Sequence, residues 1–273
     1  MESIAVVLVH GWKSHPGVWR RLIEKLSLPP ERIWSFEYTH LDKEPVRVIA
    51  RELQVFIRNK RAKENYLGKI DIVCHSMGGC VARFYIEVLD GERREEKIRQ
   101  VIEIGVPNRG SSMAEIFNDP TFGPEIIRIL TGEFVPDRYI PAHDTNVQGI
   151  RIRSGETSEL VEAGLRTDII YRNICAANRT GDPEFFPSFQ GKTWVLYPDK
   201  SWGRTWLGDG VIPHADSYLP GTGFDVVPED PDHLEAPSYQ YCHIYLPKNP
   251  EVIRLVKKYI ENPEIPSSLT WPE

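Results

Sequence analysis

The chain has 273 residues, of which 41% are hydrophobic, and a formal net charge of −6 at pH 7. This length and apolar content predict one large domain with a sizeable buried core. Acidic and basic residues are interspersed along the sequence, so the chain has no basic stripe that would collect phosphates. We therefore expect no nucleic-acid partner.

The N-terminus and the hydropathy pattern predict a cytoplasmic protein. The chain begins Met1-Glu2-Ser3 and then enters an apolar run, without the basic and apolar regions of a secretory signal. No apolar run has the length of a transmembrane segment. The four cysteines lie in apolar runs outside any CxxC motif, which favours buried free thiols over disulfides or a zinc site.

Five nearly continuous apolar runs predict buried strands. They are Ile4–Val9, Ile33–Phe36, Ile70–Cys74, Val101–Gly105 and Ile169–Ala176. The intervals between them are too long for hairpins, and runs without alternation are typical of strands covered on both faces. Helical patterns fill the intervals, for example between Val18 and Leu26 and between Val46 and Ile57. We therefore expect an α/β fold with a mostly parallel, doubly wound sheet.

The third run stops at a serine that small residues follow. The sequence Cys74-His75-Ser76-Met77-Gly78-Gly79 predicts a sharp strand-to-helix turn, which holds a serine oxygen clear of the sheet. Gly78 and Gly79 leave the room that such a turn requires. The alternative interpretation is a buried strand that simply runs into a helix of small residues. Ser76 is thus a candidate nucleophile, and a serine hydroxyl needs a base and an orienting acid.

Two segments, 106–168 and 177–208, interrupt the regular alternation and are much longer than ordinary connections between strands and helices. We interpret them as inserted cap or lid segments of a single domain, 1–273. In the first, Met113–Phe117 and Pro124–Leu130 predict short amphipathic helices that either line an acyl pocket or pack as ordinary helices. The aromatic residues of the second segment favour anchoring onto the core over lining a substrate cleft.

The candidate acid and base lie in the C-terminal third of the chain. Asp209 stands in a glycine-flanked turn, Gly208-Asp209-Gly210, that leads into a short apolar run, while Asp182 and Asp216 are the competing acids. His243 precedes a well-marked final helix and is favoured as the base over His233.

The final helix begins where Asn249 can cap it and Pro250 can occupy its first position. The acidic segment 225–235 matches no EF-hand spacing and is interpreted as a solvated loop rather than a calcium site. We expect no metal and no cofactor.

An oxyanion that develops on a substrate needs two backbone N–H donors. One normally belongs to the residue after the nucleophile, which is Met77. The other is expected in the loop after the first strand, where Gly11 permits close approach and Trp12 supplies the N–H. A plain strand-ending turn with a surface indole is the alternative reading of this loop.

These motifs resemble the lipase and esterase branch of the α/β-hydrolase superfamily. The resemblance lies in Leu8–Trp12, Cys74–Gly79, Gly105–Ser111, Asp209–Pro213 and His243 before the last helix, in this order over nearly the whole chain. Because the oxyanion strand begins at once, the chain looks like the minimal bacterial lipases. It departs from the family pattern at Cys74, Val106 and Asn108, where glycine or alanine, threonine and histidine are usual.

The resemblance implies a carboxylic ester hydrolase that acts on a small ester or lipid through an acyl-enzyme. In this interpretation Ser76 attacks, His243 carries the proton, Asp209 orients His243, and the N–H groups of Trp12 and Met77 bind the oxyanion. The same residues would serve a thioesterase, an amidase or an acyltransferase, because they define the nucleophile and not the leaving group. A non-catalytic relative that acts as an interaction module is the alternative from a different functional class.

Overall fold

The computed structural model of the protein describes residues 4–271. The start Met1-Glu2-Ser3, on which the expectation of no secretory signal rests, lies outside the described residues. Within them, no helix is long and apolar enough to cross a membrane.

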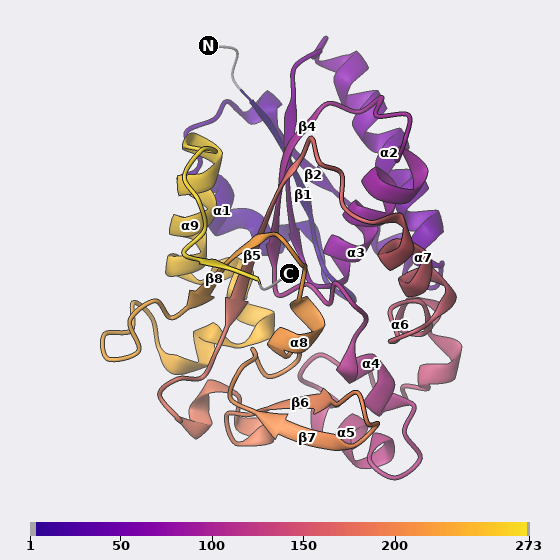
Figure 1. Cartoon of the computed structure of the whole chain (residues 1–273), viewed down its shortest axis with the longest axis vertical. Coiled ribbons are helices and arrows are strands. Elements are labelled where there is room, and N and C mark those ends of the chain that lie inside the picture. Colours follow the sequence, from indigo (N-terminus) through magenta and orange to yellow (C-terminus); the bar gives the residue numbers. More distant parts are fainter. Residues whose placement is uncertain (1–3, 272–273) are drawn as a thin grey trace.

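A central seven-stranded sheet organises the molecule (Figure 1). The strands are β1 (Ala5–Val9), β2 (Ile33–Phe36), β3 (Ile70–His75), β4 (Ile98–Ile104), β5 (Ile170–Ala176), β6 (Thr193–Leu196), β7 (Trp202–Thr205), β8 (Gly223–Val227) and β9 (Leu269–Thr270). The sheet has the order β2-β1-β3-β4-β5-β8-β9, and all its neighbours are parallel except β8 and β9. Strands β6 and β7 form a separate antiparallel hairpin. The predicted mostly parallel sheet is confirmed.

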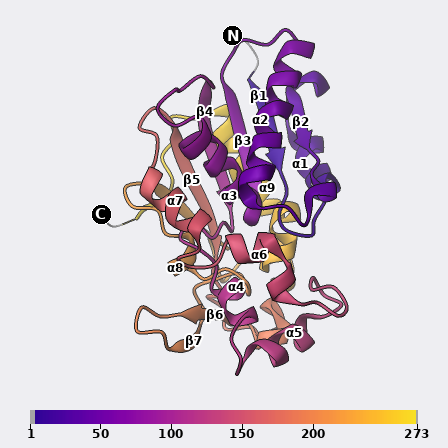
Figure 2. The same cartoon turned by 90° about the vertical axis from the view of Figure 1, so that its right-hand side faces the viewer.

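Helices cover both faces of this sheet. They are α1 (Arg20–Lys25), α2 (Val46–Lys63), α3 (Met77–Arg83), α4 (Ser112–Phe117), α5 (Gly123–Leu130), α6 (Thr145–Gly149), α7 (Gly155–Ala163), α8 (His214–Ser217) and α9 (Pro250–Glu261). Helices α1 and α9 pack together on one face, while α2, α3 and α7 cover the other (Figures 1 and 2). The fold is therefore doubly wound, as the alternating runs predict.

The strand order reverses between β1 and β3, because β2 follows β1 on one side and β3 lies on the other. In open α/β sheets, ligands bind beyond the carboxyl ends of the strands at such a switch point. Trp12 follows β1 and Ser76 follows β3. The topology alone therefore brings these two candidate residues to one crevice.

Local sequence explains the elements that frame this crevice. Strands β1 and β3 are buried along their whole length, as expected of continuous apolar runs between two helical layers. Helix α9 begins as predicted, because the Asn249 side chain accepts hydrogen bonds from the N–H groups of Glu251 and Val252, at 2.9 and 3.3 Å. Helix α3 continues as a π-helical turn over Phe84–Leu89, an irregularity that is frequent near functional sites.

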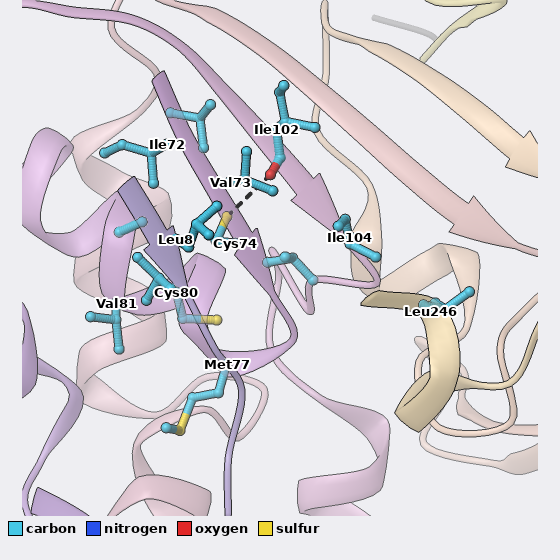
Figure 3. Packing of buried hydrophobic residues seen from close by; sticks show 14 of the residues in the cluster. Leu8, Ile72, Val73, Cys74, Met77, Cys80, Val81, Ile102, Ile104 and Leu246 are labelled. Atoms are coloured by element: carbon cyan, nitrogen blue, oxygen red, sulfur yellow. Dashed lines mark hydrogen bonds between the residues drawn. The ribbon is translucent and has the colours of Figure 1, made fainter. Parts of the chain in front are cut away.

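The core beneath the turn at Ser76 is apolar and closely packed. Figure 3 shows residues of β1, β3, β4 and α3 around Cys74, whose thiol points to the carbonyl oxygen of Ile102 at 3.6 Å. Cys74 takes the place where the family pattern has glycine or alanine, and it is fully buried between neighbouring strands. Burial raises the pKa of this thiol well above its usual value. All four cysteines are buried free thiols, so the favoured interpretation is confirmed.

The two predicted insertions build most of one end of the molecule. Helices α4 and α5 and the β6–β7 hairpin lie together beyond the carboxyl edge of the sheet in both views (Figures 1 and 2). Helix α7, at the end of segment 106–168, instead packs against the π-helical turn on one face of the sheet. Treating both segments as a cap on a single domain stays a prediction.

Substitution of Gly78 by alanine tests how closely the turn is packed. An added Cβ would lie 2.3 Å from the carbonyl oxygen of His10 and 2.7 Å from that of Val9, and both are backbone atoms at the carboxyl end of β1. We expect Gly78→Ala to lower the free energy of unfolding by about 2–3 kcal/mol. Gly155→Ala is the matched control, since no atom lies within 4 Å of its added Cβ. Urea unfolding of both variants measures the effect, and equal stabilities would contradict this packing.

Candidate active site

Ser76 occupies the turn between β3 and α3 in a backbone conformation that side chains rarely adopt. Its φ is 55° and its ψ is −135°, so the residue lies in the left-handed half of conformational space. Such a conformation costs on the order of 1–3 kcal/mol and persists only where the surrounding structure holds it. The Ser76 N–H donates to the carbonyl oxygen of Ile104 at 3.0 Å, which continues the ladder between β3 and β4. The strain thus places the hydroxyl at the edge of the sheet.

His243 lies beside this hydroxyl. It is the first residue of a 3-10 helix, η9 (His243–Lys248), and its ring is almost completely buried. Its Nε2 lies 2.8 Å from Ser76 Oγ, and its Nδ1 lies 2.7 Å from Asp209 Oδ2. With Nδ1–H donating to the carboxylate, Nε2 is free to accept the serine proton. The segment before this histidine is a short 3-10 helix, η8 (Ser238–Tyr241).

Backbone N–H groups fix the position of Asp209. Its Oδ1 accepts hydrogen bonds from the N–H groups of Val211 and Ile212 at 3.0 and 2.6 Å, which leaves Oδ2 for His243. In return, the backbone N–H of His243 donates to the carbonyl oxygen of Asp209 at 2.8 Å. Two loops that are 34 residues apart are therefore joined through both their side chains and their backbones.

Gly105, after β4, leaves the space that this pair occupies. Its φ is +54°, and an added Cβ would lie 2.7 Å from Asp209 Oδ2 and 3.2 Å from His243 Nδ1. A side chain at this position would therefore displace the carboxylate or the imidazole.

The competing candidates lie elsewhere. The side chain of His233 is 85% exposed and pairs with Asp230 at 3.0 Å. Asp182 caps a short surface helix by accepting from the N–H of Glu184. Asp216 is buried, but its carboxylate accepts from the N–H and the hydroxyl of Ser112. The structure therefore brings together Ser76, His243 and Asp209 and leaves these alternatives out.

The loop after β1 reaches the serine. A Cβ added to Gly11 would lie 2.9 Å from the Cβ of Ser76, so the backbone that leads into Trp12 passes directly over the nucleophile. The N–H of Met77 is the first of α3 and has no acceptor within that helix. The indole N–H of Trp12 is occupied by Asp144, since it donates to Asp144 Oδ2 at 3.0 Å. The backbone before Trp12 and the N–H of Met77 thus lie close to Ser76, and an oxyanion hole formed by the N–H groups of Trp12 and Met77 stays a prediction.

A cavity of about 260 Å³ opens at these residues. Its lining includes Ser76 and His243 and, from segment 106–168, the apolar side chains of Met113, Ala114, Phe117, Phe134, Val147 and Ile150. Helix α4 therefore borders the cavity, whereas no residue of α5 does, so the pocket-lining alternative holds for α4 and not for α5. The polar rim contains Lys13, Ser14, His15 and Glu133.

The aromatic residues of segment 177–208 lie apart from this cavity. Phe185, Phe186 and Phe189 are buried in the main core, and none of them lines it. These three side chains anchor the segment onto the core, as the favoured interpretation predicts, whereas Tyr197 and Trp206 are exposed. Within residues 4–271, no three His, Cys, Asp or Glu side chains are grouped as metal ligands.

Comparison with known proteins identifies the fold that carries this geometry. A protein-family model described as a domain of unknown function, DUF7379, matches residues 2–131. A sequence search of curated proteins finds no match. Among solved structures, phospholipase PlaB from Legionella pneumophila is similar with a TM-score of 0.64 and 15% identity over 97% of this chain. The chain has the α/β-hydrolase fold.

Other structures with this fold include a lipase and a thioesterase. A lipase from Bacillus licheniformis, BlEst2 in its propeptide form, has a TM-score of 0.59 and 14% identity over 98% of this chain. The thioesterase RedJ from Streptomyces coelicolor has a TM-score of 0.53 and 16% identity, covering 95% of this chain and 90% of RedJ. The chain spans only 60% of PlaB and 52% of the Bacillus lipase. At these identities the comparison establishes the fold and not the substrate.

In this fold, the sequence did not point to His75 as a contact of the candidate site. Its Nε2 lies 3.0 Å from the carbonyl oxygen of His243, and the two rings are 4.6 Å apart between centroids. Burial, followed by the neighbouring His243, holds the pKa of His75 well below its ordinary value, so the ring is neutral. It therefore donates Nε2–H to the His243 backbone and adds no charge beside that imidazole. The sequence signal that could have pointed to His75 is its position directly before Ser76. That position does not reveal that its ring contacts the His243 backbone.

A buried polar cluster lies under the loop after β4. Asn108 Nδ2 donates to Glu103 Oε2 at 2.7 Å and to Asn173 Oδ1 at 3.0 Å, while Arg83 donates to the Asn108 carbonyl oxygen and to Oδ1. Arg83 also forms a fully buried ion pair with Glu87 at 2.9 Å. Asn108, where the family pattern has histidine, therefore ties the loop to two strands, β4 and β5, and to α3.

Replacing His75 tests its positioning of His243. His75→Phe keeps a ring but removes the donor to the His243 carbonyl, and small displacements of catalytic groups are costly. We expect the rate constant for the reaction of Ser76 with a fluorophosphonate, a reagent that labels activated serines, to fall by about 10-fold or more in His75→Phe. We expect partial recovery of this rate in His75→Gln, whose side-chain amide can donate to the same carbonyl oxygen. His233→Phe, at an exposed site, is the control. An unchanged rate in a folded His75→Phe protein would show that the contact is only structural.

Glu103→Gln gives a pH-dependent prediction. Burial raises the pKa of Glu103 from 4.5 to about 7, so between these values the folded chain keeps a proton that the unfolded chain has released. The stability it contributes is complete below about pH 4.5 and is lost as the pH rises through about 7. Relative to Glu103→Gln, we expect the wild type to lose about 3 kcal/mol of unfolding free energy across this range.

Urea unfolding at a series of pH values measures the difference between the two proteins. Asp216, whose pKa burial raises to about 7, is present in both and cancels in the comparison. A difference that does not vary with pH would contradict the assignment to Glu103.

Proposed function

We propose that this chain is a serine hydrolase that cleaves carboxylic esters through an acyl-enzyme. The observation that carries the proposal is the continuous chain of hydrogen bonds from Ser76 Oγ through His243 to Asp209, with steps of 2.8 and 2.7 Å. It ends at a strained serine on the carboxyl edge of the sheet, beside an apolar cavity. An unactivated serine would have no need of such an arrangement.

The reaction follows from these contacts. Ser76 Oγ attacks the acyl carbon while His243 Nε2 takes its proton, and Asp209 stabilises the imidazolium that forms. The N–H groups of Trp12 and Met77 bind the developing oxyanion. The C–O bond to the alcohol then breaks, and His243 returns the proton to the leaving oxygen. Water, activated by the same imidazole, releases the acid and restores Ser76.

The cavity favours a short or medium acyl chain. Its volume of about 260 Å³ lies at the small end of ligand pockets, and its walls near Ser76 are mostly apolar. The acyl chain would lie against Met113 and Phe117 of α4, with Phe134 and Ile150 opposite. Lipid esters with such chains are therefore the substrate class that the cavity fits best.

A thioesterase is the second candidate, because a thioesterase shares the fold. The triad would act on a thioester in the same way, since only the leaving atom differs. Initial rates with octanoyl esters, thioesters and anilides of matched acyl chain separate these activities. An amidase would cleave the anilide at a comparable rate.

Reaction with a fluorophosphonate tests the nucleophile. We expect stoichiometric labelling of the wild type, mapped to the peptide that contains Ser76, and no labelling of Ser76→Ala, as read by intact mass. Asp209→Asn leaves the shape but removes the acceptor for imidazole Nδ1–H, so labelling should slow by about 100-fold or more. Ser112→Ala, which alters a buried serine outside the triad, should label at the wild-type rate.

Two results would contradict the proposal. One is a folded wild-type chain, verified by thermal melting, that does not react; the interaction-module alternative would then stand. The other is an adduct on a residue other than Ser76.

A further inference from the structure

A second groove, of about 580 Å³, lies beside the candidate active site. It is lined by His15, Gly17, Val18, Arg20, Arg21, Tyr239, Gln240, Tyr245 and Lys248. These residues come from the loop and helices that follow β1 and from the short helices around His243.

This groove adjoins the catalytic cavity. His15 and Val18 line both spaces, so the groove and the cavity meet at these two residues. The helix η9 also borders both, because it supplies His243 to the cavity and Tyr245 and Lys248 to the groove. The groove is therefore a neighbour of the cavity both at the loop after β1 and at the helix that carries His243.

The charge of the groove is positive, in a chain whose net charge is −6. Arg20, Arg21 and Lys248 line it, and no carboxylate is among its described lining residues. The nearest carboxylate partner of Arg20 is Glu24, at 3.9 Å, and both side chains are more than 60% exposed. Such a pair is screened by solvent and leaves the guanidinium available.

The groove also offers oriented hydrogen-bond donors. Arg21 donates to the backbone carbonyl of Lys248 at 3.2 Å, which ties α1 to η9 and fixes that guanidinium at the groove. His15 Nδ1 accepts from the N–H of Gly17 at 3.1 Å, so the neutral ring carries its proton on Nε2. Guanidinium, ammonium and imidazole donors together suit the tetrahedral oxygens of a phosphate.

We propose that this groove binds a phosphate carried by the alcohol portion of the ester, so that acyl esters of phosphorylated alcohols are preferred over neutral ones. The inference rests on the proposed function of Ser76. The acyl chain occupies the apolar cavity, Ser76 attacks the acyl carbon, and the C–O bond to the alcohol breaks. The alcohol leaves with the proton from His243, and its phosphate is chemically unchanged. The phosphate contributes binding and orientation only.

Two esters with the same acyl group test this preference. Monooctanoylglycerol is neutral, and octanoylglycerol 3-phosphate differs from it only by the phosphate. We expect kcat/KM of the wild type to be at least about 10-fold higher for the phosphorylated ester at low salt, and this advantage to shrink as salt screens the groove. Equal values for the two esters would overturn the proposal and leave the esterase function intact.

Charge-matched variants locate the effect. Arg20→Gln/Lys248→Gln removes two positive charges from the groove, and Arg51→Gln/Lys63→Gln removes two from exposed positions of α2 on the other face of the sheet. The first variant should lose most of the preference for the phosphorylated ester and keep its rate on monooctanoylglycerol. The second should behave as the wild type. Equal losses in both would assign the effect to net charge and reject the groove.

Binding to Ser76→Ala keeps the test independent of turnover. By titration calorimetry, octanoylglycerol 3-phosphate should bind more tightly than monooctanoylglycerol, and Arg20→Gln/Lys248→Gln in the Ser76→Ala background should remove the difference. If that pattern appears without hydrolysis by the wild type, the groove stands and the proposed function fails. If inorganic phosphate alone binds as tightly as the phosphorylated ester, the groove is a free-anion site and the proposal is wrong.

Discussion

The sharp turn at Ser76 is the constraint on which the rest of the site depends. The hydroxyl reaches the crevice only because the backbone takes a φ of 55° directly after a fully buried strand. That conformation is unfavourable by itself, and the sheet holds it in place. The following helix must then start against the carbonyls of Val9 and His10, where only glycine fits. The close packing of Gly78 against these carbonyls also brings the loop after β1 next to Ser76. The strained turn and the closeness of this loop to the serine therefore depend on the same contact.

The acid and the base depend on each other in a similar way. Asp209 and His243 come from irregular segments, which are usually less precise than strands or helices. Here each is fixed by the other: the side chains share one hydrogen bond, and the His243 backbone donates to the Asp209 carbonyl oxygen. His75, on β3, adds a bond to the His243 carbonyl oxygen. Asp209 and His243 are thereby fixed in position relative to β3, the strand that leads to Ser76.

Much of the fold could be predicted from the sequence because its signals are local. Continuous apolar runs gave β1 to β5, and Asn249 with Pro250 gave the start of α9. Strand β8 escaped prediction because Asp225 interrupts its apolar pattern. That carboxylate is buried only because the Tyr259 hydroxyl donates to it at 2.6 Å and the N–H of Ser268 at 3.0 Å. Both partners are more than 30 residues away, so no local pattern announces them.

The residues of the candidate site likewise differ in whether a local sequence signal points to them. Ser76 and the loop at Trp12 lie at the ends of strongly patterned strands, so motif and topology together point to them. Asp209 and His243 could be proposed only from their order and flanking residues, and Asp182, Asp216 and His233 remained competitors. What separates them in the structure is burial and backbone contact, which depend on segments distant in sequence. The contact of His75 with His243 spans 168 residues and has no sequence signature.

The division of the crevice shows why substrate choice is harder to predict than the chemistry. Its apolar wall comes from α4 and the segment after it, whereas its basic extension comes from η9 and the helices after β1. The hydrogen bonds that join Ser76, His243 and Asp209 involve neither α4 nor the side chains of Arg20 and Lys248. Under the two proposals, a new acyl chain would therefore select for changes in α4, and a new alcohol would select for changes at Arg20 or Lys248. Neither change would remove a hydrogen bond among Ser76, His243 and Asp209.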